Sequence, residues 1–125
     1  MHMCALMYYQ KAGNNMGHDK ILNELAEVLD SKFLKTLSEP VRIDILKFLI
    51  LKGQSDIGTI AENMPQDRSV VSRHLNLMHE VGILKRGKDG RHMLYEVDGE
   101  VFLEKLESIS ALVRACIKLS STTQE

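Results

Sequence analysis

A chain of 125 residues is long enough for one domain with a modest core, and its 44% hydrophobic and 26% charged residues are an ordinary globular balance. No apolar run approaches the roughly 18 residues of a membrane span, and the first residues do not resemble a secretory signal, so we expect a cytoplasmic protein. The net charge of −1 argues by itself against a nucleic-acid partner, and two distant cysteines do not make a disulfide scaffold.

The first part of the chain predicts an arm and two helical segments. Residues 1–17 lack a clear period, and we interpret them as an N-terminal arm. Apolar residues then recur at helical spacing over residues 19–29, with Asp19 as the expected N-cap. A second, short helical segment is predicted over residues 31–37.

A strong helix start follows at residues 38–40, Ser-Glu-Pro. A serine side chain can cap a helix, glutamate favours the positive end of the helix dipole, and proline suits the first turn. We therefore expect a helix from Val41 to about Leu51, capped by Ser38. Gly53 ends it.

Two further helices are predicted close together. Asp56 is the expected cap of a short helix over residues 57–63. Asp67 is the expected cap of another helix, over residues 68–81, which stops before a glycine. Because only about four residues join the two helices, the pair is typical of a helix-turn-helix.

The C-terminal part predicts a β-hairpin and a long helix. Two strands are expected over residues 83–86 and 91–97, and the turn between them, at residues 87–90, contains an Asp-Gly pair that favours hairpins. An amphipathic helix is expected over residues 100–119, before a polar tail at residues 120–125. The predicted fold class is therefore mainly α with a small β-hairpin.

The helix over residues 68–81 has two contrasting faces. On a helical wheel its apolar residues fall together: Val71, Leu75 and Met78. The opposite face carries hydrogen-bonding side chains: Ser69, Ser72, Arg73 and Asn76. Arg68 lies at the flank near the helix start, and together these groups suit phosphates and base edges. The alternative is a plain solvated polar face.

The hairpin that follows is basic although the whole chain is not. Its cationic residues are Lys85, Arg86, Lys88 and Arg91, whereas residues 96–107 are mainly acidic. A basic β-turn beside a DNA-reading helix is typical of a wing, which reaches along the phosphate backbone or into the minor groove. The alternative is an edge hairpin kept soluble by its charges.

The histidines of this region do not predict a metal site. His74 lies toward the core flank of its helix, so we expect a half-buried, hydrogen-bonded side chain, and we expect His79 on the surface. His92 lies on the second strand. No pair of histidines, His/Asp pair or cysteine cluster falls within one helical turn, so no complete metal site is visible and we predict no cofactor.

Several segments resemble one family of bacterial repressors. Residues 37–46, Leu-Ser-Glu-Pro-Val-Arg-Ile-Asp-Ile-Leu, resemble a characteristic helix of the ArsR/SmtB family. Residues 67–75, Asp-Arg-Ser-Val-Val-Ser-Arg-His-Leu, are similar to that family's recognition helix, and residues 81–84 and 90–95 resemble its wing. The resemblance covers roughly residues 25–116, which is most of the chain.

The resemblance implies a winged helix-turn-helix protein that dimerises through its first and last helices. Residues 18–119 would then form the DNA-binding and dimerisation domain. The implied function is a repressor that binds double-stranded DNA at an inverted-repeat operator and is released by a metal, metalloid or thiol-reactive signal. Two apolar stripes without another obvious partner agree with the homodimer: Ile21, Leu25 and Val28, and Leu106, Ile109 and Val113.

The known signal sites of that family are incomplete in this chain. Positions that hold cysteines in the arsenic-type and persulfide-type sites are Asp56, Gly58 and Lys47 here. The positions of the zinc-type ligands carry no ligand: Gly99, Val101, Leu112 and Ala115. Cys4 and Cys116 remain as candidates for a thiol or metal sensor. The alternative is that Cys116 is a small apolar residue of the dimer stripe and Cys4 is incidental.

Two other function classes fit the sequence less well than DNA binding. An enzyme is not expected, because the chain lacks a catalytic Ser/His/Asp or Cys/His arrangement, a glycine-rich phosphate loop and a convincing carboxylate pair. A winged helix that binds a protein instead of DNA is the alternative. Such a module would not need cations clustered beside serines, as they are around Arg73 and the hairpin.

Overall fold

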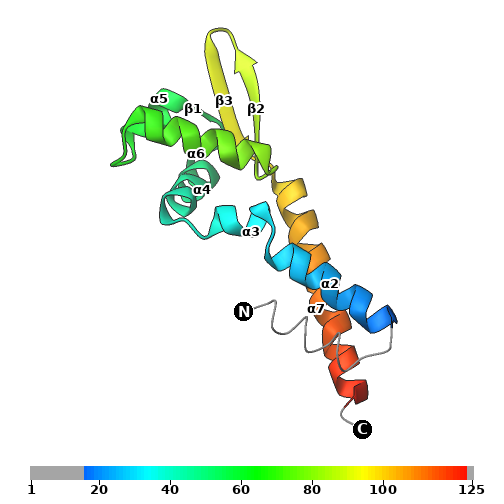
Figure 1. The fold of residues 1–125 in the computed structure, drawn as a ribbon. Helices are drawn as coiled ribbons and strands as arrows, with labels where there is room; N and C mark the ends of the chain where they lie inside the picture. The colour runs from blue at the N-terminus through cyan, green and yellow to red at the C-terminus, as the bar shows by residue number, and fades with distance from the viewer. Residues whose placement is uncertain (1–15, 124–125) are drawn as a thin grey trace. The chain divides into compact units, whose positions relative to one another are not determined.

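The computed structural model describes residues 16–123, and its Cα positions divide into two units. One unit is Lys32–Leu103, and the other contains the segments on both sides of it. The predicted fold class is confirmed: the chain is mainly helical, with a small antiparallel sheet that includes a hairpin (Figure 1). The elements in chain order are α2 (Met16–Leu29), α3 (Lys32–Leu37), α4 (Pro40–Lys52), β1 (Ser55–Asp56), α5 (Ile57–Glu62), α6 (Arg68–Glu80), β2 (Leu84–Asp89), β3 (His92–Val97) and α7 (Gly99–Thr123).

Two of the expected helix caps are wrong. Helix α2 begins at Met16, inside the predicted arm, so Asp19 lies within its first turn instead of capping it. The Ser38 hydroxyl donates back to the Lys35 carbonyl oxygen at 2.6 Å, because serine also bonds well to a preceding carbonyl. The N-cap of α4 is consequently Glu39, which makes no side-chain capping bond.

The ends of α4 follow the sequence closely. Pro40 occupies the first turn, where its missing N–H has no partner to lose. Gly53 ends the helix with φ at +79°, a conformation that other residues rarely adopt, and its N–H donates to the Leu49 carbonyl at 2.8 Å.

The core of the unit Lys32–Leu103 is built from helices α3 to α6 and the start of the hairpin. Its fully buried side chains are Ile45, Ile60, Val71, Leu75, Met78, Ile83 and Tyr95. Burying one such aliphatic side chain contributes about 1.5–3 kcal/mol, so this cluster holds α6 against α4 and α5. The predicted core face of α6 is confirmed in all three of its residues.

The sheet has strand order β1-β3-β2 and is antiparallel throughout. Strands β2 and β3 pair from Leu84 opposite Val97 to Asp89 opposite His92, so the predicted turn at residues 87–90 is wrong. Only Gly90 and Arg91 lie between the paired strands, and Gly90 has φ at +64°. A positive φ at the first central residue alone is typical of a type II′ turn, which matches the twist of the strands.

Strand β1 was not predicted. It has two residues, Ser55 opposite Tyr95 and Asp56 opposite Leu94, and forms only because the hairpin offers it an edge. A segment this short has no alternating pattern from which a sequence could predict it.

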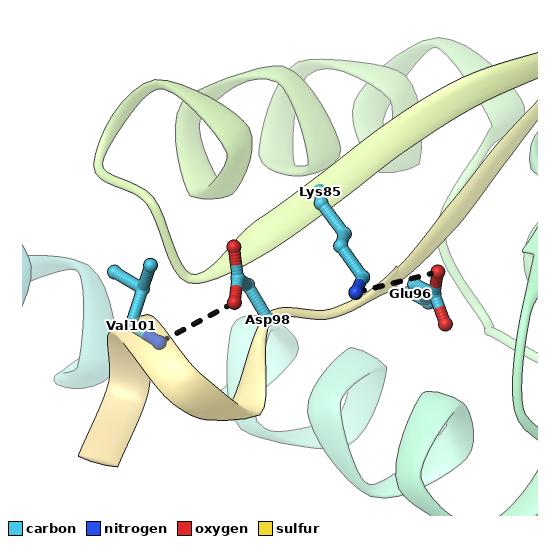
Figure 2. A network of polar contacts seen from close by, with 4 residues as sticks. All are labelled: Lys85, Glu96, Asp98 and Val101. Atoms are coloured by element: carbon cyan, nitrogen blue, oxygen red, sulfur yellow. Dashed lines mark hydrogen bonds and ion pairs between the residues drawn. The ribbon is translucent and has the colours of Figure 1, made fainter. Parts of the chain in front are cut away.

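Helix α7 is longer at its C-terminus than expected. The carboxylate of Asp98 accepts a hydrogen bond from the Val101 N–H at 3.3 Å and caps the start of the helix (Figure 2). Near that start, the rings of Phe33 and Phe102 meet edge to face with centroids 5.6 Å apart. The helix continues to Thr123, so most of the predicted polar tail is helical. Within the described residues, no helix is both long enough and apolar enough to cross a membrane.

Candidate nucleic-acid interface

Helices α5 and α6 form the predicted helix-turn-helix pair. The Asp56 carboxylate caps α5 by accepting from the Thr59 N–H at 2.8 Å, as expected. Hydrogen bonding by the Thr59 side chain, and after it by the Thr59 N–H, holds the pKa of Asp56 below its ordinary value. Asp67 stands at the N-cap position of α6 but makes no side-chain capping bond. That carboxylate adds only its charge at the helix start.

The hydrogen-bonding face of α6 is turned away from the core. Ser69, Arg73 and Asn76 are exposed, and Ser72 is half-buried. This face lies opposite Val71, Leu75 and Met78, which are buried. Side chains near the N-terminal half of the helix are therefore available to an external partner, the arrangement by which a recognition helix reads a groove.

Arg68 lies beside α5 at the start of α6. A methyl group placed on Gly58 of α5 would lie 3.7 Å from an Arg68 guanidinium nitrogen and 3.8 Å from a carboxylate oxygen of Asp56. The charge of Arg68 also contributes, as the smallest of several causes, to the lowered pKa of Asp56. Arg68 thus lies against the first helix of the pair, although its side chain remains exposed.

The four cations of the hairpin have different surroundings. Lys85 is paired with Glu96, its cross-strand neighbour, with Nζ 3.8 Å from the carboxylate (Figure 2). Arg86 is bonded to α6, as described next. Lys88 and Arg91 lie at and beside the tip, are exposed, and make no hydrogen bond or ion pair among the described residues. Among the described residues, these two at the tip are the cations of the hairpin without a hydrogen bond or ion pair, and they are available to an external partner.

Two hydrogen bonds to the side-chain oxygen of Asn76 join the hairpin to α6. A guanidinium nitrogen of Arg86 donates to the Asn76 side-chain oxygen at 3.1 Å. The Tyr95 hydroxyl donates to the same oxygen at 3.4 Å, a longer and weaker bond. Tyr95 did not emerge from the sequence as a site residue. The signal was its position opposite Arg86, which becomes visible only when the strand register is known.

A second contact joins α4 to α6. Arg42 donates from Nε to Nδ1 of His74 at 3.2 Å and from its terminal nitrogen to the Thr36 carbonyl at 3.3 Å. His74 is half-buried and hydrogen-bonded as expected, and burial followed by the Arg42 charge lowers its pKa. A cavity of about 320 Å³ adjoins this pair, and its lining residues are Arg42, Val70, Arg73, His74 and Leu77.

The expectation for His79 is wrong. It is half-buried instead of on the surface, and its pKa is lowered first by burial and then by the nearby charge of Arg86. His79 lies in the last turn of α6, and α6 packs against β2, which the helical wheel alone does not show.

Of the two candidate sensor cysteines, the structure describes Cys116. Cys4 lies outside the described residues. Cys116 is a free, half-buried thiol on α7, and burial raises its pKa. The described residues contain no group of three or more His, Cys, Asp or Glu side chains arranged to hold a metal ion. His92 instead contacts the carboxylate of Asp56 at 3.2 Å.

The segment from the start of α4 to the first residues of β2 matches a known protein family. The family model described as "Bacterial regulatory protein, arsR family" matches residues 39–86. The chain is 31% identical over 70 residues to a cadmium resistance transcriptional regulatory protein CadC homolog from Staphylococcus aureus. That match covers 56% of this chain but only 58% of the relative, so the chain matches little more than half of that relative's length.

A second relative is covered more fully. The chain is 31% identical over 72 residues to the HTH-type transcriptional regulator MJ1325 of Methanocaldococcus jannaschii, which covers 57% of this chain and 81% of the relative. Among solved structures, a possible transcriptional regulator for arsenical resistance is 26% identical with a TM-score of 0.55, over 74% of this chain and 96% of the other. A homodimeric winged helix-turn-helix domain from Mycobacterium bovis has the same fold, with 21% identity, a TM-score of 0.54 and coverage of 85% and 89%.

The helix-turn-helix, the hairpin wing and these matches lead to one family. The chain belongs to the arsR family of bacterial regulatory proteins.

Proposed function

We propose that this protein is a transcriptional repressor that acts in the cytoplasm and binds an inverted-repeat DNA operator as a homodimer. The observation that carries the proposal is the joint exposure of one face of α6 and the tip of the hairpin. Both belong to one compact unit, and a hydrogen bond connects them.

The proposed contacts divide into two kinds. Arg73 on α6 reads a base edge, since an arginine at an exposed helix face can bond a guanine through two N–H groups. Ser69, Ser72 and Asn76 extend the same face, and Arg68 lies at its N-terminal end. Lys88 and Arg91 at the hairpin tip bind phosphates, which contribute affinity without sequence information.

The homodimer is proposed from exposed apolar side chains on α7. Leu103, Leu106, Val113 and Ile117 are exposed, and at 100° per residue they fall on one face of the helix. Obligate interfaces resemble a domain core cut in half, and a two-fold dimer matches an inverted repeat. The homodimeric state of the Mycobacterium bovis domain supports the same assembly.

The releasing signal is proposed only as a class. The names of two similar proteins refer to cadmium resistance and to arsenical resistance, which supports a metal or thiol-reactive inducer. The usual positions of the family lack ligands in this chain, so such a signal would act through Cys116 or Cys4.

The test is DNA binding by the intact protein. A duplex selected from a random-sequence library by the wild type is compared with a scrambled duplex by fluorescence anisotropy. We expect Arg73→Ala to weaken binding to the selected duplex by about 1–3 kcal/mol and to the scrambled duplex much less. Lys88→Ala is the matched control and should weaken both duplexes to the same extent. Equal losses on both duplexes for Arg73→Ala would show that Arg73 does not read a base. Failure of the wild type to select any duplex would refute the function.

A further inference from the structure

Asn76 is the meeting point of the hairpin and α6. Its side-chain oxygen accepts from Arg86 on β2 at 3.1 Å and from Tyr95 on β3 at 3.4 Å. Arg86 and Tyr95 are direct cross-strand partners, so their side chains point to the same face of the sheet. Tyr95 is 2% exposed, whereas Asn76 and Arg86 are exposed. The contact therefore reaches from the core of the unit to its surface.

The chemistry of Arg86 determines which atom of Asn76 faces it. A guanidinium group has only donors, so the Asn76 atom that it bonds must be the carbonyl oxygen. A carbonyl oxygen has two acceptor sites, and Arg86 and Tyr95 use both. The amide nitrogen of Asn76, with two N–H donors, is the group left for another partner.

We propose that the Arg86–Asn76–Tyr95 contact sets the position of the wing relative to α6 and leaves Asn76 as a donor-only contact to DNA. The proposal rests on the DNA-binding function proposed above. It changes the expected role of Arg86 from a phosphate contact to a positioning residue that acts through Asn76.

The donor-only state restricts what Asn76 can recognise. Bidentate reading of adenine by an asparagine needs the carbonyl oxygen and the amide nitrogen together. Because the oxygen is already occupied, Asn76 can donate to a phosphate, to N7 of either purine, to O6 of guanine or to O4 of thymine, but it cannot accept from the N6 amino group of adenine. An asparagine on a recognition helix would otherwise be expected to read adenine, and the hairpin contact prevents it.

The positioning role of Arg86 is tested by a double-mutant cycle on the library-selected duplex. We expect Arg86→Ala and Asn76→Ala each to raise Kd roughly 3- to 10-fold, and the double variant to lose no more than the larger single loss. Lys88→Ala is the matched control, because it removes a cation from the same face of the same strand. Its effect should add to that of Asn76→Ala and lower the salt slope of log Kd by about 0.9, whereas Arg86→Ala should leave the slope unchanged.

Two results of the binding experiment would overturn the proposal. One is an additive loss for Arg86→Ala with a salt slope reduced as in Lys88→Ala, because Arg86 would then be a phosphate contact. The other is a preference for adenine over guanine that the wild type shows in a selected-duplex library and that Asn76→Ala abolishes, because that discrimination needs the Asn76 oxygen as an acceptor for the adenine amino group. Asn76→Ala should instead reduce a preference for guanine, for thymine or for purines as a class, or weaken all duplexes equally.

A measurement on the free protein separates this proposal from the DNA-binding function. We expect hydrogen exchange of the β2 and β3 amides to accelerate in Asn76→Ala and Arg86→Ala but not in Lys88→Ala. Asn76→Asp keeps an acceptor for Arg86 and Tyr95 but removes the donors, so exchange should stay slow while DNA affinity falls. Wild-type exchange rates in Asn76→Ala would overturn the positioning role. Accelerated exchange together with a wild type that binds no duplex would refute the DNA-binding function and the contact of Asn76 with DNA, and would support the positioning role of Arg86.

Discussion

Arg73 and His74 are neighbours on α6, yet one is exposed and the other is half-buried. The difference arises because successive residues of a helix are rotated by about 100°, which turns His74 toward α4. There its ring accepts a hydrogen bond from Arg42, which requires an unprotonated Nδ1. The folded protein therefore favours neutral His74, as its lowered pKa indicates.

This environment predicts a loss of stability in mild acid. The unfolded chain takes up a proton on His74 below about pH 6.5, whereas the folded protein resists it, so the unfolded state binds more protons. The contribution of His74 to the free energy of unfolding is complete above about pH 6.5. It is lost as the pH falls toward the lowered pKa that His74 has in the folded protein. We expect a lower urea midpoint at pH 5.5 than at pH 7.5.

His74→Gln isolates the contribution of this side chain. Glutamine keeps an acceptor for Arg42 but does not titrate, so the difference between the two midpoints should shrink. His79, whose pKa is also lowered by burial, contributes in the same direction, and His74→Gln with His79→Gln should shrink the difference further. An undiminished difference in the double variant would contradict this account.

Cys116 is expected to be a slow thiol. Burial raises its pKa, so less thiolate is present near neutral pH than on an exposed cysteine. In a Cys4→Ser background, reaction with Ellman's reagent at pH 7.5 should be several-fold slower than that of glutathione. The same protein in concentrated urea should react at the glutathione rate. Equal rates in the folded protein would remove the argument against Cys116 as a fast thiol sensor.

At the scale of elements, the hairpin depends on a single backbone conformation. Gly90 has φ at +64°, and although a methyl group there would meet no atom within 4 Å, the backbone itself would be strained. We expect Gly90→Ala to lower the free energy of unfolding by about 1–3 kcal/mol in urea titrations.

Gly87 provides the control within the same hairpin. It also has open space at its methyl position, but its φ is not positive. Gly87→Ala should therefore change the free energy of unfolding by less than about 0.5 kcal/mol. If both substitutions had the same effect, side-chain crowding or solvation would be responsible instead of the turn conformation.

At the scale of the whole molecule, the exposed apolar face of α7 predicts a homodimer. Leu106 and Val113 of α7 are 40% and 39% exposed. Burying them against a second copy of the chain would stabilise the dimer by about 25 cal/mol for each Å² of apolar surface removed from water. Light scattering at micromolar concentration should give about twice the chain mass of 14.2 kDa. Leu106→Glu combined with Val113→Glu should give the single-chain mass.

Ile50 supplies the matched control for the assembly. It lies on α4 and is 69% exposed, so Ile50→Glu also replaces an exposed apolar side chain by a charge. The proposed interface does not include α4, so this variant should keep the mass of the wild type. A wild type that is monomeric and still binds the selected duplex would contradict the proposed homodimer.

Local signals in the sequence determined much of the fold. Pro40, Gly53 and the Asp56 cap marked helix ends correctly because each acts through backbone geometry within a few residues. The helical period of Val71, Leu75 and Met78 predicted the core face of α6, and with it the exposed face that carries Arg73. These inferences need no knowledge of distant contacts.

Only the tertiary structure decided the features that depend on register and on approach between elements. The turn at Gly90 and Arg91 follows from pairing Asp89 with His92, whereas the sequence alone allowed a longer turn. The same register brings Arg86 and Tyr95 to Asn76, from positions 10 and 19 residues away. Local periodicity determines which side of one element faces inward, but the choice of partner depends on how separate elements pack, because side chains distant in sequence meet only after folding.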